Sequence, residues 1–131
     1  MDAPTRATLH TAQKALLHVH KAILDEERRR YEAAHGRIPS AMGFLQLLLN
    51  DDWFAWLRPM SGLAAQIDEA LFAKPGEPTM APSLLLEEAR FLLSPRHEGE
   101  DLPARLYQMI QSVPEVAVAH AEALRIWPAT A

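Results

Sequence analysis

The chain has 131 residues, of which 49% are hydrophobic and 23% are charged, and we expect one globular domain spanning residues 1–131. Its formal net charge of -4 gives no reason to expect nucleic acid or an anionic membrane surface as a partner, and we predict neither. With no cysteine, disulfides, thiolate catalysis and cysteine-ligated metal centres are excluded, and no apolar run reaches the roughly 20 residues of a membrane span.

Residues 5–35 have the periodicity of one long amphipathic helix. Thr5 or Thr8 is the expected N-cap, and Gly36 lies where a left-handed helix C-cap belongs. No apolar segment in the first residues resembles the core of a signal peptide, so we expect a cytoplasmic protein. The apolar face of this helix consists of Leu9, Ala12, Leu16, Val19, Ile23 and Tyr31.

The same helix carries a charged run, DEERRR, at residues 25–30. It pairs Asp25 with Arg29 and Glu26 with Arg30, each acid four residues before its base. We interpret the run as a solvated helix face; the alternative is a docking site for a charged partner.

Two further helices are predicted before residue 73. Residues 41–49 form a short helix capped by Ser40, and its nearly continuous apolar run indicates burial on more than one side. Residues 51–72 form the helix around which the core is built, with Asp51 as N-cap and a kink at Pro59. The predicted core residues on its apolar face are Trp53, Trp56, Leu57, Met60, Leu63, Ile67 and Leu71.

The rest of the chain predicts three more helices. After a loop at residues 73–78, Thr79 caps a helix that extends to about residue 93. A polar segment at 94–101 precedes a helix over 102–112, and Pro114 opens the last one, over 114–127. Merging the helices interrupted at proline or aspartate gives four rods, and short connections make sequential rods antiparallel. We therefore predict an all-α, up-down helical bundle.

The segment LLLNDDWFAWLRPMSGLAAQIDEAL resembles a segment close to HDPWFAWLRPLSELIVxID in a family of small uncharacterised bacterial helical proteins. The resemblance extends to ILDEERRRYEAAHGRI in the first helix and to VAVAHAEALR near the C-terminus. Asn50 replaces the histidine of the family segment, and Asp52 replaces its proline. The resemblance implies a helical fold and a bacterial source, and it implies no catalytic residue.

Three polar residues fall on apolar helix faces and are candidate metal ligands. His20 and Glu27 share the apolar face of the first helix, and His120 lies on that of the last. Helical bundles build metal sites from such side chains on facing helices. The alternative is structural: a buried histidine hydrogen-bonded to Glu27, a tyrosine or a backbone carbonyl. The structural interpretation is favoured, and no metal is predicted.

Trp53 and Trp56 are candidates for an aromatic ligand cleft, although indole rings at helical spacing more often belong to the core. Arg58 is expected to hydrogen-bond Asp68, Asp101 or the end of a neighbouring helix; the alternative is an anionic ligand. No nucleophile pattern or glycine-rich phosphate loop is present, so we predict neither an enzyme nor a cofactor.

The helix that follows residue 79 has more apolar surface than one packing face can bury. Leu84 and Phe91 form a second stripe, seven residues apart, and are candidate interface residues for a homodimer. The helix at 41–49 is the alternative cover for this stripe. The sequence thus favours a non-enzymatic bundle that acts through homo- or hetero-association, with another protein as a possible partner. The alternative is a small-molecule- or metal-binding bundle that uses His20, Glu27 and His120 or the Trp53/Trp56 cleft.

Overall fold

The computed structural model describes residues 1–128, and in this range it contains six α-helices, one 3-10 helix and no strand. The predicted all-α class is therefore confirmed. The predicted domain runs to residue 131, so its last three residues lie outside the described part. The elements are α1 (Ala3–His35), α2 (Ala41–Asn50), η1 (Asp52–Leu57), α3 (Arg58–Phe72), α4 (Pro82–Leu92), α5 (Leu102–Ser112) and α6 (Pro114–Ile126).

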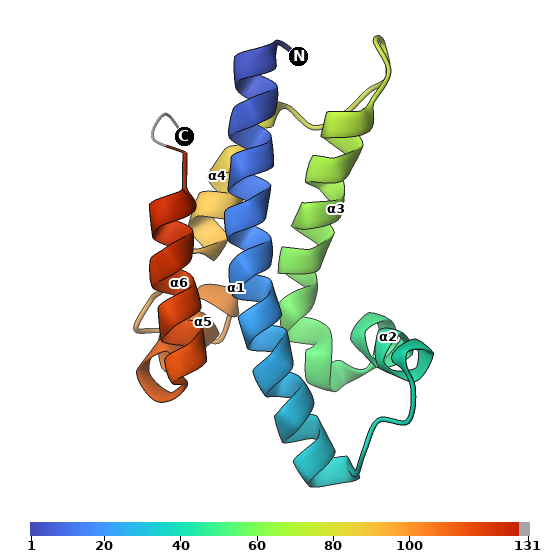
Figure 1. The fold of residues 1–131 in the computed structure, drawn as a ribbon, viewed down its shortest axis with the longest axis vertical. Coiled ribbons are helices and arrows are strands. Elements are labelled where there is room, and N and C mark those ends of the chain that lie inside the picture. The colour runs from blue at the N-terminus through green and yellow to red at the C-terminus, as the bar shows by residue number, and fades with distance from the viewer. Residues whose placement is uncertain (129–131) are drawn as a thin grey trace.

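Helix α1 is the centre of the fold (Figure 1). It packs against α6 on one side and α3 on the other, while α4 contacts both α1 and α3. The Asp2 carboxylate accepts a hydrogen bond of 2.8 Å from the Thr5 amide, so Asp2 is the N-cap in place of Thr5 or Thr8. Gly36 ends the helix at the predicted position and with a positive φ of 91°, but its ψ of 169° lies outside the left-handed helical region that was predicted. Because three helices cover α1, its buried face is wide: Leu9, Ala12, Gln13, Ala15, Leu16, Val19, Ile23 and Glu27.

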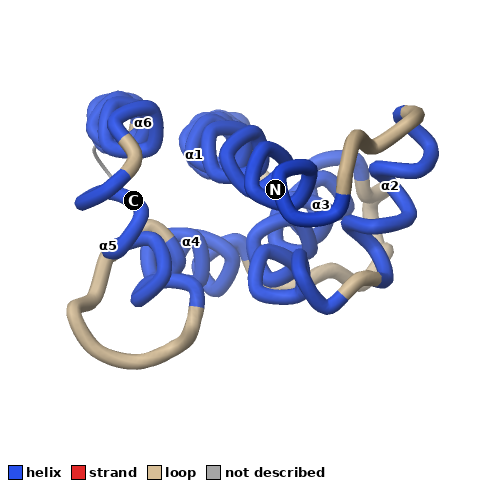
Figure 2. Tube along the Cα trace, turned by 90° about the horizontal axis from the view of Figure 1, so that it is seen from below, coloured by secondary structure: helices blue, strands red, loops and turns tan. Residues whose placement is uncertain are grey.

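The predicted four-rod arrangement is not reproduced. Val113 adopts an extended conformation, with φ of -123° and ψ of 102°, so α5 and α6 are separate helices and not one broken rod. Figure 2 shows α6 beside α1 and α5 on the side of α4. Pro114 occupies the first turn of α6, where its missing N–H costs no helical hydrogen bond.

The segment after Asp51 differs from the predicted continuous helix. Asp51 caps as expected, accepting from the Trp53 amide at 2.8 Å, but the residues that follow form the 3-10 helix η1. Pro59 then lies in the first turn of α3, because a proline there needs no amide partner. A 3-10 helix has three residues per turn, so Phe54 and Leu57 point the same way. Both are buried, at 1% and 3% exposed.

This change of period corrects the predicted core. Trp53 and Trp56 are half-buried and pack against the core from outside, whereas Phe54, which was not on the predicted arc, lies inside it. The rest of the predicted face is buried as expected: Leu57, Met60, Leu63, Ile67 and Leu71.

Helix α2 is on the outside of the molecule, and the prediction that it is buried on more than one side is wrong. It packs against η1, and none of its residues is fully buried. Leu45 and Leu49 are 47% and 62% exposed. Ser40 caps the helix as predicted, accepting from the Gly43 amide at 3.0 Å.

Helix α4 starts later than predicted. Its N-cap position is Ala81, which has no capping side chain, so Thr79 is not the cap. Pro82 disfavours the helical conformation at Ala81, whose ψ of 137° is extended, and the helix begins at the proline itself. Asp101 caps α5, with its carboxylate 3.4 Å from the Ala104 amide.

Candidate functional site

The three candidate metal ligands have separate environments. His120 is buried, and its Nε2 lies 2.8 Å from the Leu93 carbonyl oxygen; because a carbonyl only accepts, Nε2 carries the proton. His20 is half-buried, and burial lowers its pKa. Glu27 is buried beside Arg30. No group of three or more histidine, aspartate or glutamate side chains within residues 1–128 is arranged to hold a metal ion.

His120 thus has the backbone-carbonyl partner that the structural interpretation expected. Its hydrogen bond joins α6 to the residue that ends α4.

Arg58 performs the structural role predicted for it. Its Nε donates to the Leu48 carbonyl at 2.9 Å, and its Nη2 donates to the Asp51 carbonyl at 2.5 Å. The Leu48 carbonyl lies in the last turn of α2, where the helix leaves acceptors unsatisfied, and the Asp51 carbonyl, at the α2 C-cap, also accepts from the Phe54 amide at 3.2 Å. Arg58 therefore fixes α2 to the start of α3, and neither Asp68 nor Asp101 is its partner.

A pocket of about 470 Å³ lies between α1, η1 and α5, at the two predicted cleft tryptophans. A smaller pocket of about 140 Å³ adjoins it and shares Glu27, Arg30, Trp56 and Arg105 with it. The Arg105 guanidinium lies 5.2 Å from the centroid of a Trp56 ring, within cation–π range. The larger pocket is lined by Glu27, Arg30, Asp52, Trp53, Ala55, Trp56 and Arg105.

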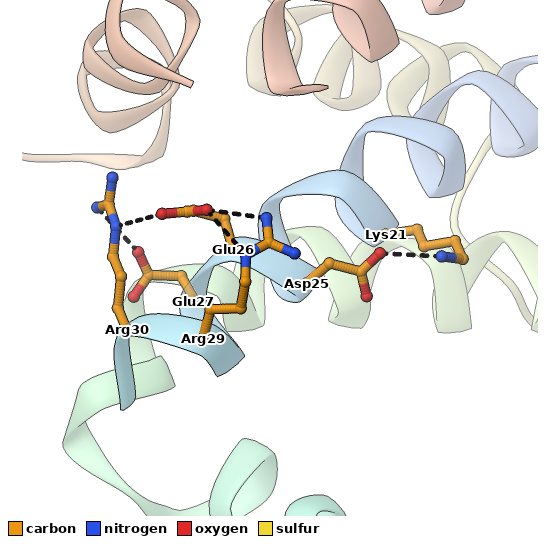
Figure 3. A network of polar contacts seen from close by, with 6 residues as sticks. All are labelled: Lys21, Asp25, Glu26, Glu27, Arg29 and Arg30. Atoms are coloured by element: carbon orange, nitrogen blue, oxygen red, sulfur yellow. Dashed lines mark hydrogen bonds and ion pairs between the residues drawn. The ribbon is translucent and has the colours of Figure 1, made fainter. Parts of the chain in front are cut away.

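Two of the residues that line the pocket, Glu27 and Arg30, belong to a network of acidic and basic side chains on α1 (Figure 3). Arg30 Nε is 2.9 Å from a carboxylate oxygen of Glu26, and Arg30 Nη1 is 3.4 Å from one of Glu27. Arg29 also pairs with Glu26, at 2.9 Å, while Asp25 pairs with Lys21. The predicted pair of Glu26 with Arg30 is confirmed, and the predicted pair of Asp25 with Arg29 is not formed.

Glu27 is the unusual group of the pocket wall. Burial raises the pKa of its carboxyl group, and the positive charges of Arg30 and Arg105 and the Trp53 indole N–H oppose that rise. The Trp53 N–H acts on the carboxylate by proximity, outside hydrogen-bonding geometry. The indole nitrogens of Trp53 and Trp56 are both buried, and neither has a hydrogen-bond partner among the described residues.

The second candidate site is the outer face of α4, which we call the α4 stripe: Leu84 and Phe91. They are 53% and 44% exposed, whereas Leu85, Ala89 and Leu92 on the inner face are buried. The stripe borders a groove of about 540 Å³ between α3 and α4, lined by Pro59, Gly62, Leu63, Gln66, Met80, Leu84, Glu87 and Glu88.

The sequence identified both tryptophans as cleft candidates and the α4 stripe as an interface candidate. It named Glu27 only as a possible metal ligand or histidine partner, and it did not identify Arg30 or Arg105 as pocket residues. Arg30 belongs to a charged run that reads as a solvated face, and Arg105 reaches the pocket only because α5 folds back toward η1. An unpaired arginine beside the aromatic cleft would have indicated the site. The sequence could not show this, because Arg105 and Trp56 come together only in the folded chain.

Comparison with known proteins gives no further assignment: no protein-family model, curated protein or solved structure matches the chain. Within residues 1–128, no helix combines the length and the apolar composition that crossing a membrane requires.

Proposed function

We propose that this protein is a non-enzymatic helical bundle that acts by self-association through the α4 stripe. The observation that carries the proposal is the exposure of Leu84 and Phe91, at 53% and 44%, on a helix whose opposite face is already buried in the chain's own core. Apolar side chains aligned on one helix face and rimmed by charges are typical of a partner surface.

The intramolecular alternative for covering the stripe is not used. Helix α2 packs against η1 and leaves Leu84 and Phe91 open. Within the described chain, the only cation over the stripe is Arg96, whose guanidinium lies 5.1 Å from the centroid of the Phe91 ring. A second copy of the chain can bury more of the stripe than one flexible side chain does.

Two-fold symmetry defines how the stripes pair. If Leu84 of one copy packs on Phe91 of the other in an antiparallel pair, the midpoint falls between Glu87 and Glu88. Burying the exposed half of each side chain contributes about 1 kcal/mol, or about 4 kcal/mol for the four side chains of a dimer. A micromolar dimer needs about 8 kcal/mol, so residues of the groove beside the stripe must be buried as well. The glutamates of both copies meet near the axis and repel, so added salt should strengthen the dimer by screening that repulsion.

Light scattering of the wild type and of matched double variants tests the proposal. We expect a wild-type dimer, and a monomer when Leu84→Glu and Phe91→Glu are combined, because charges cannot be buried unpaired in the pair of stripes. The control combines Leu45→Glu with Leu49→Glu on α2, which are comparably exposed, and this variant should stay dimeric. A wild-type monomer at micromolar concentration refutes the proposal, and a dimer lost only in the α2 variant moves the interface to α2.

A further inference from the structure

The pocket between α1, η1 and α5 has more hydrogen-bond donors than acceptors to meet them. Guanidinium groups and indole N–H groups can only donate. Arg105 is exposed and forms no ion pair among the described residues. The buried N–H of Trp56 has no hydrogen-bond partner among the described residues, and that of Trp53 lies near the Glu27 carboxylate. The free donors that face the pocket are those of Arg105, so a ligand that pairs with them should bring acceptor oxygens.

The arginines of the pocket are not equivalent. Arg30 is held by Glu26 and Glu27, at 2.9 Å and 3.4 Å, so its charge is already balanced. Arg105 is held only by the face of Trp56, which leaves its N–H groups free for a planar oxyanion. The anion therefore belongs at Arg105.

The remaining walls favour a ligand with an apolar body. Trp53, Ala55 and Trp56 line the larger pocket, and Met109 lines the smaller one that adjoins it. The volume of about 470 Å³ is within the range of small-molecule sites, about 300–1,000 Å³.

We propose that this pocket binds a small organic carboxylic acid, with its carboxylate on Arg105 and its apolar body against Trp56 and Trp53. Such an acid pairs with the free guanidinium of Arg105 and covers the exposed indole surface at once. Arg105 and Glu27 are then both ligand-binding residues: Arg105 pairs with the carboxylate, and Glu27 contacts it when protonated.

Glu27 links this binding to pH. The charged groups that face it are Glu26 and Arg30 of α1, Asp52 of η1 and Arg105 of α5. A ligand carboxylate adds one more negative charge beside Glu27, which favours the protonated form of Glu27. Protonated Glu27 can donate to the ligand, whereas ionised Glu27 repels it, so the ligand should bind more tightly at lower pH.

Tryptophan fluorescence with benzoate as the probe tests the site in the full-length chain. Trp127 lies near Arg90, outside the pocket lining, and Trp127→Phe leaves only the two pocket tryptophans to report. In this background we expect saturable quenching by benzoate and none by benzylamine, which has the same ring but a cationic group. The absence of saturable benzoate quenching, or tighter binding of benzylamine, overturns the proposal.

Variants then assign the residues. Arg105→Gln should weaken benzoate binding about tenfold or more, because a charge-assisted pair is lost. Arg125→Gln, an exposed arginine of α6, should leave the affinity unchanged. The wild-type affinity should rise as pH is lowered toward the raised pKa of Glu27, whereas Glu27→Gln, which stays neutral, should lose this dependence. Equal affinity in Arg105→Gln and wild type, or unchanged pH dependence in Glu27→Gln, overturns the assignment.

Discussion

Replacing Phe54 by alanine should destabilise the protein more than replacing either neighbouring tryptophan. Phe54 is 1% exposed, and its ring centroid lies 5.6 Å from that of Tyr31 and 5.8 Å from that of Phe44. Truncating a fully buried phenylalanine costs about 3–5 kcal/mol, from the lost transfer free energy and the cavity left behind. Trp53 and Trp56 are half-buried, so Trp53→Ala or Trp56→Ala should cost about half as much, ~2 kcal/mol.

Urea unfolding measures these differences, and the chain supplies a matched control. Phe72 is 82% exposed at the end of α3, so Phe72→Ala should change the free energy of unfolding by less than about 0.5 kcal/mol. The m-value should be the same in all variants, so that a change in the urea midpoint reports a change in the free energy of unfolding. Equal midpoints for Phe54→Ala and Phe72→Ala, or a larger loss in Trp56→Ala, would refute the placement of Phe54 in the core.

Three further perturbations follow from single groups. Burial lowers the pKa of His20, so the unfolded state binds the proton more readily and stability should fall as pH drops below about 6.5. In His20→Leu the urea midpoint should depend less on pH in this range. An unchanged pH dependence would contradict the burial of His20. Burial raises the pKa of Glu27, so its contribution is greatest at low pH and is lost as pH rises through the folded-state pKa; Glu27→Gln should therefore raise the thermal midpoint near neutral pH, and a lower midpoint would show that the Arg30 pair dominates. Arg58→Met removes two charged hydrogen bonds to carbonyls, which should cost about 1.5–3 kcal/mol and speed amide exchange in α2; slow exchange there would contradict the role of Arg58.

The local signals in the sequence were sufficient for most helix boundaries. Gly36, Ser40, Asp51 and Pro114 each act on the residues next to them in the chain, through a positive φ, a capping oxygen or a missing N–H. Their effect depends little on the rest of the fold, and the structure places each of them at the predicted boundary.

Which side chains and helices are buried was less predictable, because burial depends on the helical period and on contacts between residues distant in sequence. After Asp51 an α-helix would bury Trp56, whereas the observed 3-10 helix buries Phe54. The capping signal at Asp51 is compatible with both kinds of helix. The apolar run of α2 predicted burial, but hydrophobicity alone does not say whether the chain itself provides the cover.

The two candidate sites also differ in how far the sequence predicts them, because one lies on a single helix and the other is formed by distant segments. The α4 stripe could be predicted because the spacing of Leu84 and Phe91 on one helix defines it. The pocket could be predicted only in part, since Arg105 comes from α5 and Glu27 from α1, 78 residues apart. The Leu93 carbonyl that holds His120 carries no side-chain signal at all, so no pattern could have named it.

The most direct test of self-association is sedimentation equilibrium of the wild-type protein at low and at high salt. Pairing of the α4 stripes predicts a dimer at micromolar concentration that becomes stronger as salt screens Glu87 and Glu88 of the two copies. If this face instead bound a basic protein through its glutamates, added salt would weaken that complex. A single species with the mass of one chain at every concentration and salt level would contradict self-association through this face.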